Sequence, residues 1–489
     1  MGSANLDGYV TGSAYPTSIN FEFSPAWIAH ILRRGGRRPP PVRGPIRLLD
    51  IGCGDGITLA SIAAAYPEGQ FIGLDAMEEH IQRGQTFAKA LGISNVELRQ
   101  GTFEDALARM PEEFDYITCQ GVIAWVSPEN RTRVLDLAAR SLAPGGVFAV
   151  GYNSMPGWTD RMGLQHLIRI FGDQVDGTPS ECFKEALDQI QALAKAGAPV
   201  VAAERIEDFL GLLSRFSSDY FPHEYLNHYW APIWSADLKG EMARRDLSFA
   251  AQINYERFRE DFCLKAAQRA GLEGLENPLL RDTAIDVLCN TAFRIDLYLR
   301  DPVKAPYPEL MRDAWITAPE PAESAQFEAR TAAGRLKFDN AATRGVLDVL
   351  SSGPCPVATL LSDLDLSEAD ILNALDSLST GNQILPAVPT LEVASAAKIN
   401  AQLKDWCRNG SPLAVDVQIG QNGPLRLSPN ELMILGTEAE EIFANAEADV
   451  SFRERVFHED ADFSGPEILD TIKAAQAEIA ARLARQGLV

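Results

Sequence analysis

A short glycine-rich turn is the first place in this sequence where residue types and spacing suggest chemistry. Residues 48–59 read LLDIGCGDGITL, in which Asp50 and Asp55 lie between two apolar runs. The alternating glycines of the turn are Gly52, Gly54 and Gly56. Glycine lets a ligand approach the backbone closely and tolerates positive φ angles. Two carboxylates would repel a phosphate and would attract an ammonium or sulfonium group, so the turn predicts a cationic ligand without phosphates.

Two other nucleotide-binding turns do not fit this stretch. The dinucleotide fingerprint requires a small residue where Ile57 stands, and the phosphate loop requires a Lys-Ser/Thr pair that the stretch lacks. Asp75 ends the next β-rich run, QFIGLD, where a carboxylate can accept hydrogen bonds from two ribose hydroxyls. S-adenosylmethionine (AdoMet), which has a ribose and a sulfonium but no phosphate, fits these features.

The elements around the turn predict how it is positioned. Residues 46–151 alternate β-rich runs with helical stretches, which is typical of a doubly wound, parallel α/β sheet. The β-rich runs are IRLLDIG, QFIGLDA, VELRQG, FDYITCQG and VFAVGYN. Ligands of such sheets bind at the carboxyl ends of the strands, which is where the glycine turn and Asp75 fall.

The motifs D-I-G-C-G-D-G and G-L-D-A-M resemble the first two motifs of the class I AdoMet-dependent methyltransferases. The resemblance implies a Rossmann-like methyltransferase sheet with AdoMet as cofactor. It further implies that the glycine turn lines the methionine and ribose, that Asp75 binds the ribose, and that Ala76 and Met77 pack on the adenine.

The resemblance also implies roles after the third and fourth β-rich runs. Most relatives have an aspartate that binds the adenine amino group where this chain has Thr102, so the backbone of Phe103 or the carboxylate of Glu104 could serve instead. Gln120 and Gly121 would face the sulfonium. The full set of implied cofactor-binding residues is Asp50, Gly52, Cys53, Gly54, Asp55, Gly56, Asp75, Ala76, Met77, Thr102, Phe103, Gln120 and Gly121.

A methyl-acceptor pocket is expected after the fourth and fifth β-rich runs, where Trp125, Tyr152, Asn153 and Trp158 fall. Methyl transfer is an in-line displacement that depends on alignment and desolvation, and aromatic faces can hold a sulfonium or an amine. We predict these four residues as catalytic, together with Tyr15 in a segment expected to cap the cofactor. The alternative is that the Pro-Gly turn ending at Trp158 carries aromatic residues that only pack.

The acceptor is predicted from a closer resemblance. The chain has Q-G-V-I-A-W-V where enzymes that methylate bases or glutamine carry D/N-P-P-Y/F. The segments GVIAWVSP, YNSMPGW, YFPHEYLNHYWAPIWSADL and NTAFRIDLYL resemble bacterial methyltransferases with a methyltransferase regulatory domain, the group that contains the rickettsial protein lysine methyltransferases. This resemblance implies lysine of a protein as the acceptor. A small-molecule O-, N- or S-methyltransferase and a non-catalytic AdoMet-binding regulator stay open as alternatives.

Four domains are expected along the chain. They are an AdoMet-binding domain with its N-terminal cap (1–165), a mostly helical regulatory or substrate domain (166–320), a winged-helix-like domain (321–392) and an α-rich domain (393–489) that ends in an amphipathic helix at 465–488. Helical periodicity is read from 164 to 299, including LRDTAIDVLCNTAFRIDLYLR. Between Phe338 and Pro386 the sequence has one basic residue, Arg344, and seven acidic residues. Because DNA readers need basic residues there, this module is expected to bind protein or to form a homodimer.

Composition limits the remaining classes. A net charge of -23 would repel nucleic acids and anionic membranes. The seven cysteines form no C-x-x-C pair, and with no secretory signal pattern they suggest free thiols in a reducing cytoplasm.

His223 and His228 of HEYLNH are spaced five apart, whereas the zinc motif H-E-x-x-H requires a spacing of four. We therefore expect a packed aromatic insertion near the acceptor pocket, without a metal, and a protein without nucleic-acid partners or membrane insertion. His80 and His166 are interpreted as surface or core residues.

Overall fold

The structure is a computed structural model that describes most of the chain up to Ala387. The described ranges are 20–110, 113–198, 209–210, 220–319, 322–387, 418–420, 423–425, 473 and 476–477. Tyr15, nearly all of the domain predicted at 393–489 and most of its amphipathic helix lie outside the described residues. The predicted domain boundaries therefore stay predictions.

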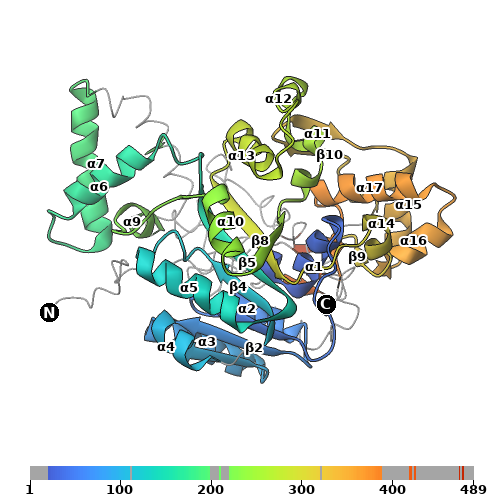
Figure 1. The fold of residues 1–489 in the computed structure, drawn as a ribbon, viewed down its shortest axis with the longest axis horizontal. Helices are drawn as coiled ribbons and strands as arrows, with labels where there is room; N and C mark the ends of the chain where they lie inside the picture. The colour runs from blue at the N-terminus through green and yellow to red at the C-terminus, as the bar shows by residue number, and fades with distance from the viewer. Residues whose placement is uncertain are drawn as a thin grey trace.

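A mixed β-sheet forms the centre of the described molecule (Figure 1). Its strands follow the order β3-β2-β1-β4-β5-β8-β7, and β6 pairs with the end of β5. The strands are β1 (Arg47–Ile51), β2 (Gln70–Asp75), β3 (Val96–Gln100), β4 (Phe114–Gln120), β5 (Leu142–Met155), β6 (Ile233–Trp234), β7 (Leu247–Gln252) and β8 (Phe293–Arg300). The first five strands are parallel, so the predicted doubly wound α/β fold is confirmed.

Helices cover both faces of the parallel strands. These helices are α1 (Pro25–Arg34), α2 (Ile57–Ala64), α3 (Glu78–Leu91), α4 (Phe103–Arg109) and α5 (Pro128–Ser141), and the 3-10 turn η1 (Phe21–Phe23) precedes them. Leu48 belongs to a buried cluster with residues of α1, α2 and α3, whereas Leu49 belongs to a second cluster with residues of α4 and α5. Successive strand side chains point to opposite faces, so the apolar run of β1 contributes to both clusters.

The prediction of a mostly helical region from 164 to 299 is wrong where β6, β7 and β8 form, and the segment FRIDLYLR of β8 departs from it most. This strand runs antiparallel between β5 and β7 and widens the sheet. Arg294 and Asp296 are fully buried in it and pair with each other at 2.9 Å. Two charged residues in an interior strand are rare unless they are paired, and their presence made the segment resemble the polar side of a helix.

The rest of the predicted helical region divides into two parts in Figure 1. A lobe at the upper left contains α6 (Met162–Gly172), α7 (Pro179–Lys195) and α9 (Tyr220–Tyr225). The second part contains α10 (Ser235–Ala243), η3 (Tyr255–Phe258), α11 (Glu260–Cys263), α12 (Ala266–Ala270) and α13 (Pro278–Cys289). Helix α7 begins at a capping box in which Thr178 and Glu181 bond each other's backbone N–H groups. Strand β6, which lies between the two parts in the sequence, pairs with the end of β5.

The described C-terminal unit follows α14 (Tyr307–Met311). It contains α15 (Ala341–Leu350), α16 (Val357–Asp363) and α17 (Glu368–Thr380), a small sheet of β12 (Cys355–Pro356), β9 (Trp315–Thr317) and β13 (Leu385–Pro386), and a hairpin of β10 (Glu328–Thr331) and β11 (Gly334–Lys337) after η4 (Ala322–Ser324). The pair β14 (Gln418–Gly420) and β15 (Gly423–Leu425) lies further along the chain. The expected three helices are present, and the winged-helix assignment itself stays a prediction.

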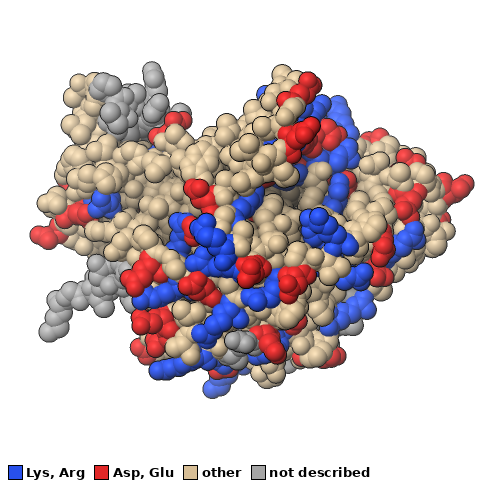
Figure 2. All heavy atoms as spheres, in the orientation of Figure 1, with Lys and Arg blue, Asp and Glu red and all other residues tan. Residues whose placement is uncertain are grey.

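The surface carries both signs of charge on the face shown in Figure 2, where lysines and arginines lie among aspartates and glutamates. Among the described helices, none combines the length and the apolar character that a bilayer crossing requires. The described cysteines are free thiols.

Candidate functional site

A cavity of about 650 Å³ lies at the carboxyl ends of β1, β2 and β4 and reaches α9 of the helical lobe. This volume is in the usual range for a small-molecule site. Of the predicted cofactor-binding residues, those that line it are Asp50, Gly52, Cys53, Gly54, Asp55, Asp75, Ala76, Met77, Thr102, Phe103, Gln120 and Gly121. Gly56 is not among the lining residues. The chain therefore brings residues from the carboxyl ends of four strands, β1 to β4, to one cavity.

Asp75, the last residue of β2, fixes the conformation of the glycine turn by a hydrogen bond. The φ angles of Gly52, Gly54 and Gly56 are 73°, 57° and 65°, which glycine adopts without strain. Asp75 accepts hydrogen bonds from the backbone N–H of Gly54 at 3.0 Å and of Met77 at 2.9 Å. One carboxylate thus joins the turn after β1 to the turn after β2.

Gly56 has a structural place at the N-terminus of α2. A Cβ atom there would lie 2.6 Å from the side chain of Leu98. The structure therefore does not bring Gly56 to the cavity, in contrast to its predicted contact with the cofactor. The residue instead allows α2 to start close to β3.

The carboxylates give the cavity an electrostatic preference for cations. Desolvation raises the pKa of Asp50 to about 6, the hydrogen bond from Thr118 opposes this shift, and the charge of Asp75 adds to it. Asp55 is paired with Arg83 at 2.5 Å, so its charge is compensated within the protein. Asp50 and Asp75 are the carboxylates whose charge a cationic ligand would offset.

The predicted adenine end is formed differently from the common pattern. Thr102 is the N-cap of α4, and its hydroxyl accepts a hydrogen bond from Asp105 N at 3.1 Å and donates one to Asp105 Oδ2 at 2.8 Å. Glu104 does not line the cavity, whereas Phe103 does. The hydroxyl of Thr102 is already committed, which favours Phe103 among the residues considered for the adenine contact.

The loop after β4 presents polar groups without partners. The Oε1 atom of Gln120 and the Nε1 atom of Trp125 are buried and have no hydrogen-bond partner among the described residues. Gly151 on β5 makes room for Gln120, since a Cβ atom there would lie 1.9 Å from its Oε1. Unpaired buried polar groups cost free energy, so these atoms mark a place where ligand groups can bind.

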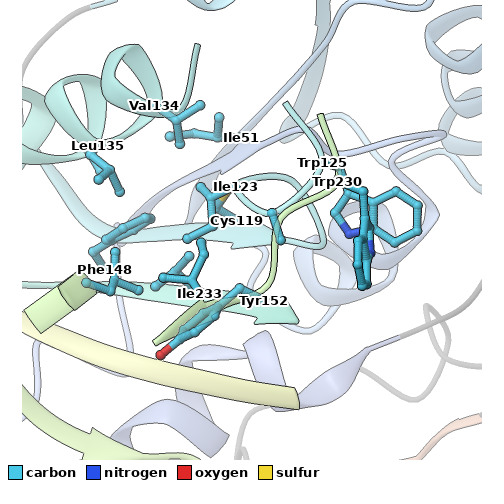
Figure 3. Packing of buried hydrophobic residues seen from close by; sticks show 14 of the residues in the cluster. Ile51, Cys119, Ile123, Trp125, Val134, Leu135, Phe148, Tyr152, Trp230 and Ile233 are labelled. Carbon is cyan, nitrogen blue, oxygen red and sulfur yellow. The ribbon is translucent and has the colours of Figure 1, made fainter. Parts of the chain in front are cut away.

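The predicted catalytic residues separate into two groups. Trp125, Asn153 and Trp158 line the cavity. Tyr152 does not: it is fully buried, its hydroxyl donates to Asp296 Oδ2 at 2.8 Å, and Figure 3 shows this hydroxyl pointing away from Trp125. Neighbouring residues of a strand point to opposite faces, so Asn153 faces the cavity and Tyr152 cannot. Its prediction as a catalytic residue is contradicted.

The insertion predicted near the acceptor pocket forms part of the cavity wall. Phe221, Glu224 and Tyr225 of α9 line the cavity. Asn153 donates a hydrogen bond to Glu224 Oε1 at 2.9 Å, and both residues are buried. The side-chain amide of Gln165 in α6 donates to backbone carbonyls at the end of α9, including that of Tyr225 at 3.4 Å. These bonds fix a carboxylate and a phenol beside the aromatic residues.

Comparisons with known proteins agree with this arrangement. Residues 48–146 match the model of a methyltransferase domain, and residues 217–300 match that of a predicted methyltransferase regulatory domain. An uncharacterized protein of Rickettsia prowazekii is 30% identical over 223 residues, which cover 43% of this chain and 84% of that protein. The chain belongs to the AdoMet-dependent methyltransferases with a regulatory domain.

Two further proteins are similar to this methyltransferase, one in structure and one in sequence. The structure of PKMT2 from Rickettsia typhi in complex with AdoHcy has the same fold, with a TM-score of 0.68, 19% identity and coverage of 97% of this chain and 99% of that chain. A ubiquinone biosynthesis O-methyltransferase of Sinorhizobium fredii is 34% identical over 136 residues, which cover 26% of this chain and 52% of that protein. The predicted Rossmann-like fold, regulatory domain and AdoMet cofactor are confirmed.

Sequence reasoning missed several residues of the methyltransferase cavity. His80 and Arg83 of α3 line it, and His80 Nδ1 lies 3.5 Å from Asp75 Oδ1. Their spacing of three on a helix that follows Asp75 was an available signal, because such residues share a helix face. Phe293 also lines the cavity, and its contribution depends on the antiparallel strand that the sequence did not reveal.

Proposed function

We propose that this methyltransferase transfers a methyl group to an amine, namely the side-chain amine of lysine residues in a protein. The observation that carries the proposal is the buried carboxylate of Glu224, which lies in the same cavity as the glycine turn and among aromatic side chains. Aromatic faces and a carboxylate together suit a cationic amine. The acceptor end thus has the chemistry expected for lysine.

The residues around the glycine turn would hold AdoMet. Asp75 would bind the ribose hydroxyls, Met77 and Phe103 would contact the adenine, and Asp50 would offset the positive charge. The orphaned Oε1 atom of Gln120 and the acidic lining fit a cationic ligand. When bound, AdoMet supplies an electrophilic methyl group.

The protein's part in the reaction is to bind, orient and desolvate the acceptor. Lysine attacks only as a neutral amine, and burial among apolar side chains lowers the pKa of an ammonium group. Trp125 and Trp158 line the acceptor end, and Trp158 packs edge-on against Trp230 with ring centroids 4.9 Å apart. This apolar wall would exclude water and direct the amine towards the methyl group.

Further support comes from charge and from similarity. The net charge of -23 favours encounter with basic, lysine-rich acceptors, and PKMT2 from Rickettsia typhi shares the fold over nearly the whole chain. The partial similarity to an O-methyltransferase covers 26% of this chain. A buried carboxylate at the acceptor end attracts a cationic amine more strongly than a neutral hydroxyl.

The test is to incubate the purified protein with methyl-labelled AdoMet and a size-fractionated bacterial lysate. Label in protein bands that mass spectrometry assigns to lysine supports the proposal. Label confined to the small-molecule fraction contradicts it and favours a metabolite methyltransferase.

A further inference from the structure

Two thiols meet in the helical part that follows β7. Cys263 is the last residue of α11 and Cys289 is the last residue of α13, and both take part in one hydrophobic cluster. The Sγ atom of Cys289 lies 3.7 Å from the carbonyl oxygen of Cys263, and the two thiol groups are hydrogen-bond partners. Two cysteines that are 26 residues apart in the sequence therefore bring their sulfur atoms together.

The surroundings of Cys289 make its thiol reactive. The hydrogen bond from Cys263 and the charge of Arg257 lower the pKa of Cys289 to about 7, whereas burial and the charge of Glu256 act in the opposite direction. Arg257 is held in place by Asp286, which accepts a hydrogen bond from its guanidinium at 2.8 Å. The thiolate is the nucleophilic form of cysteine, so Cys289 is a nucleophile near neutral pH.

The other described cysteines differ from Cys289 in this respect. Their pKa values are raised, for most of them chiefly by burial, and they are Cys53, Cys119, Cys182, Cys263 and Cys355. Cys289 is also only half-buried, so part of it is accessible to a small oxidant. A low pKa combined with access makes a cysteine susceptible to oxidation.

The end of α13 leads directly into the wall of the AdoMet cavity. Residues 290–293 connect α13 to β8, and Ala292 and Phe293 line the cavity. The carbonyl oxygen of Ala292 accepts a hydrogen bond from Trp158 Nε1 at 2.8 Å. The position of Trp158 therefore depends on a segment that begins one residue after Cys289.

We propose that Cys263 and Cys289 are a site of reversible oxidation by hydrogen peroxide, and that the disulfide bond they form slows methyl transfer. A covalent bond replaces a hydrogen-bond contact, so the end of α13 is drawn towards α11. This movement displaces Ala292 and, through its hydrogen bond, Trp158 at the acceptor end of the cavity. The inference goes beyond the proposed function, because it does not depend on which acceptor is methylated.

The oxidation proceeds in two steps. The Cys289 thiolate attacks one oxygen of hydrogen peroxide, an S–O bond forms as the O–O bond breaks, and hydroxide leaves with the electron pair. The Cys263 thiol then attacks the sulfur of this sulfenic acid, the S–S bond forms as the S–O bond breaks, and water leaves with the proton of Cys263. The two sulfurs lose two electrons in total, which the peroxide gains, and exchange with a thiol reductant restores both thiols.

The first test is whether the bond forms. The reduced full-length protein is treated with hydrogen peroxide, the remaining thiols are alkylated, and the peptides are mapped by mass spectrometry without reduction. We expect the peptides of Cys263 and Cys289 to be linked in the wild type and not in C289S. The matched control is C355S, at a residue that is also half-buried, and it should form the same bond as the wild type. A Cys289 that stays free for alkylation, or that bonds to another cysteine, overturns the inference.

The second test replaces Cys263 by Ser, which keeps a hydrogen-bond donor for Cys289 but cannot form the disulfide bond. Peroxide should then leave Cys289 as a sulfenic acid, and dimedone, which reacts with sulfenic acids, should label it. Without dimedone label on Cys289, this residue would not be the thiol that reacts with peroxide, and the inference would be wrong.

The third test measures the effect on catalysis. Oxidised protein freed of peroxide is incubated with methyl-labelled AdoMet and a bacterial lysate without added reductant, and the readout is the total initial rate of label transfer. We expect the oxidised wild type to be at least about tenfold slower than the reduced protein, because small displacements at an aligned site are costly. Dithiothreitol should restore the rate, AdoMet affinity should stay unchanged, C289S should be insensitive to peroxide, and C355S should respond as the wild type does.

The outcomes separate this inference from the proposed function. If the bond forms and the rate stays that of the reduced protein, the inference is overturned while the function stands. If the wild type labels an acceptor other than lysine and oxidation slows that reaction, the inference stands while the proposed function is overturned.

Discussion

At the scale of single residues, Asp75 connects the two turns that form the cofactor end. Its oxygens accept hydrogen bonds from Gly54 N and Met77 N. Replacing Asp75 by Ala should lower AdoMet affinity at least 100-fold, because it removes both the proposed ribose contact and two charge-assisted bonds of the turn. Calorimetric titration with AdoMet measures this. An affinity within threefold of the wild type would show that the ribose lies elsewhere.

The ionisation of Asp50 should make the affinity for AdoMet depend on pH. Its pKa is about 6 in the free protein because desolvation opposes ionisation, and a bound cation favours the ionised form. AdoMet affinity should therefore rise as the pH increases towards 6 and level off above it. Replacing Asp50 by Asn should flatten this part of the profile. A wild-type profile that is already flat between pH 5 and pH 7 would contradict the assignment of Asp50 to the sulfonium.

At the scale of elements, the parallel strands could be predicted because each is an apolar run between helices and carries a motif at its carboxyl end. Two features could not. Strand β8 contains the buried ion pair of Arg294 and Asp296. Asp296 also accepts a hydrogen bond from Tyr152, 144 residues earlier in the chain, and periodicity cannot reveal such a partner. The choice between Tyr152 and Asn153 depended on which face of β5 meets the cavity, and the sequence of β5 does not say which. Local patterns give elements, whereas long-range pairing decides which side chains reach the site.

The close packing of helix α3 against the glycine turn should affect both stability and AdoMet binding. Gly84 lies so close to the glycine turn that a Cβ atom would be 1.9 Å from the carbonyl oxygen of Asp55. Gly84→Ala should push α3 away from the turn, destabilise the protein by about 1–3 kcal/mol and lower AdoMet affinity. Thermal unfolding with and without AdoMet measures both effects.

The control for this prediction is Gly163 in α6. A Cβ atom at Gly163 would meet no atom within 4 Å. Gly163→Ala should leave affinity unchanged and stabilise the helix by about 0.5–1 kcal/mol. If both alanine variants had the same stability and the same AdoMet affinity, the glycine turn could move without weakening AdoMet binding, and the prediction would be wrong.

At the scale of the whole molecule, one buried carboxylate joins the C-terminal unit to the methyltransferase domain. Asp376 of α17 is 2% exposed and accepts two hydrogen bonds from Arg34 of α1, both at 2.8 Å. The hydroxyls of Tyr255 and Tyr307 also donate to it, each at 3.1 Å. In Figure 1, α17 and its neighbours lie at the right, away from the lobe that contains α9. Asp376 does not line the AdoMet cavity, so docking of the unit and cofactor binding should be separable.

Replacing Asp376 by Ala tests this separation. The change leaves the partly buried guanidinium of Arg34 without its counter-charge, and breaking a fully buried pair in this way costs up to about 3–5 kcal/mol. We expect faster hydrogen exchange across 303–387, a lower thermal midpoint and unchanged AdoMet affinity. Asp348→Ala, at an exposed position of α15, should change none of these. If Asp376→Ala lowered AdoMet affinity while the control did not, the C-terminal unit would be coupled to the cavity and would act on catalysis rather than only on acceptor proteins.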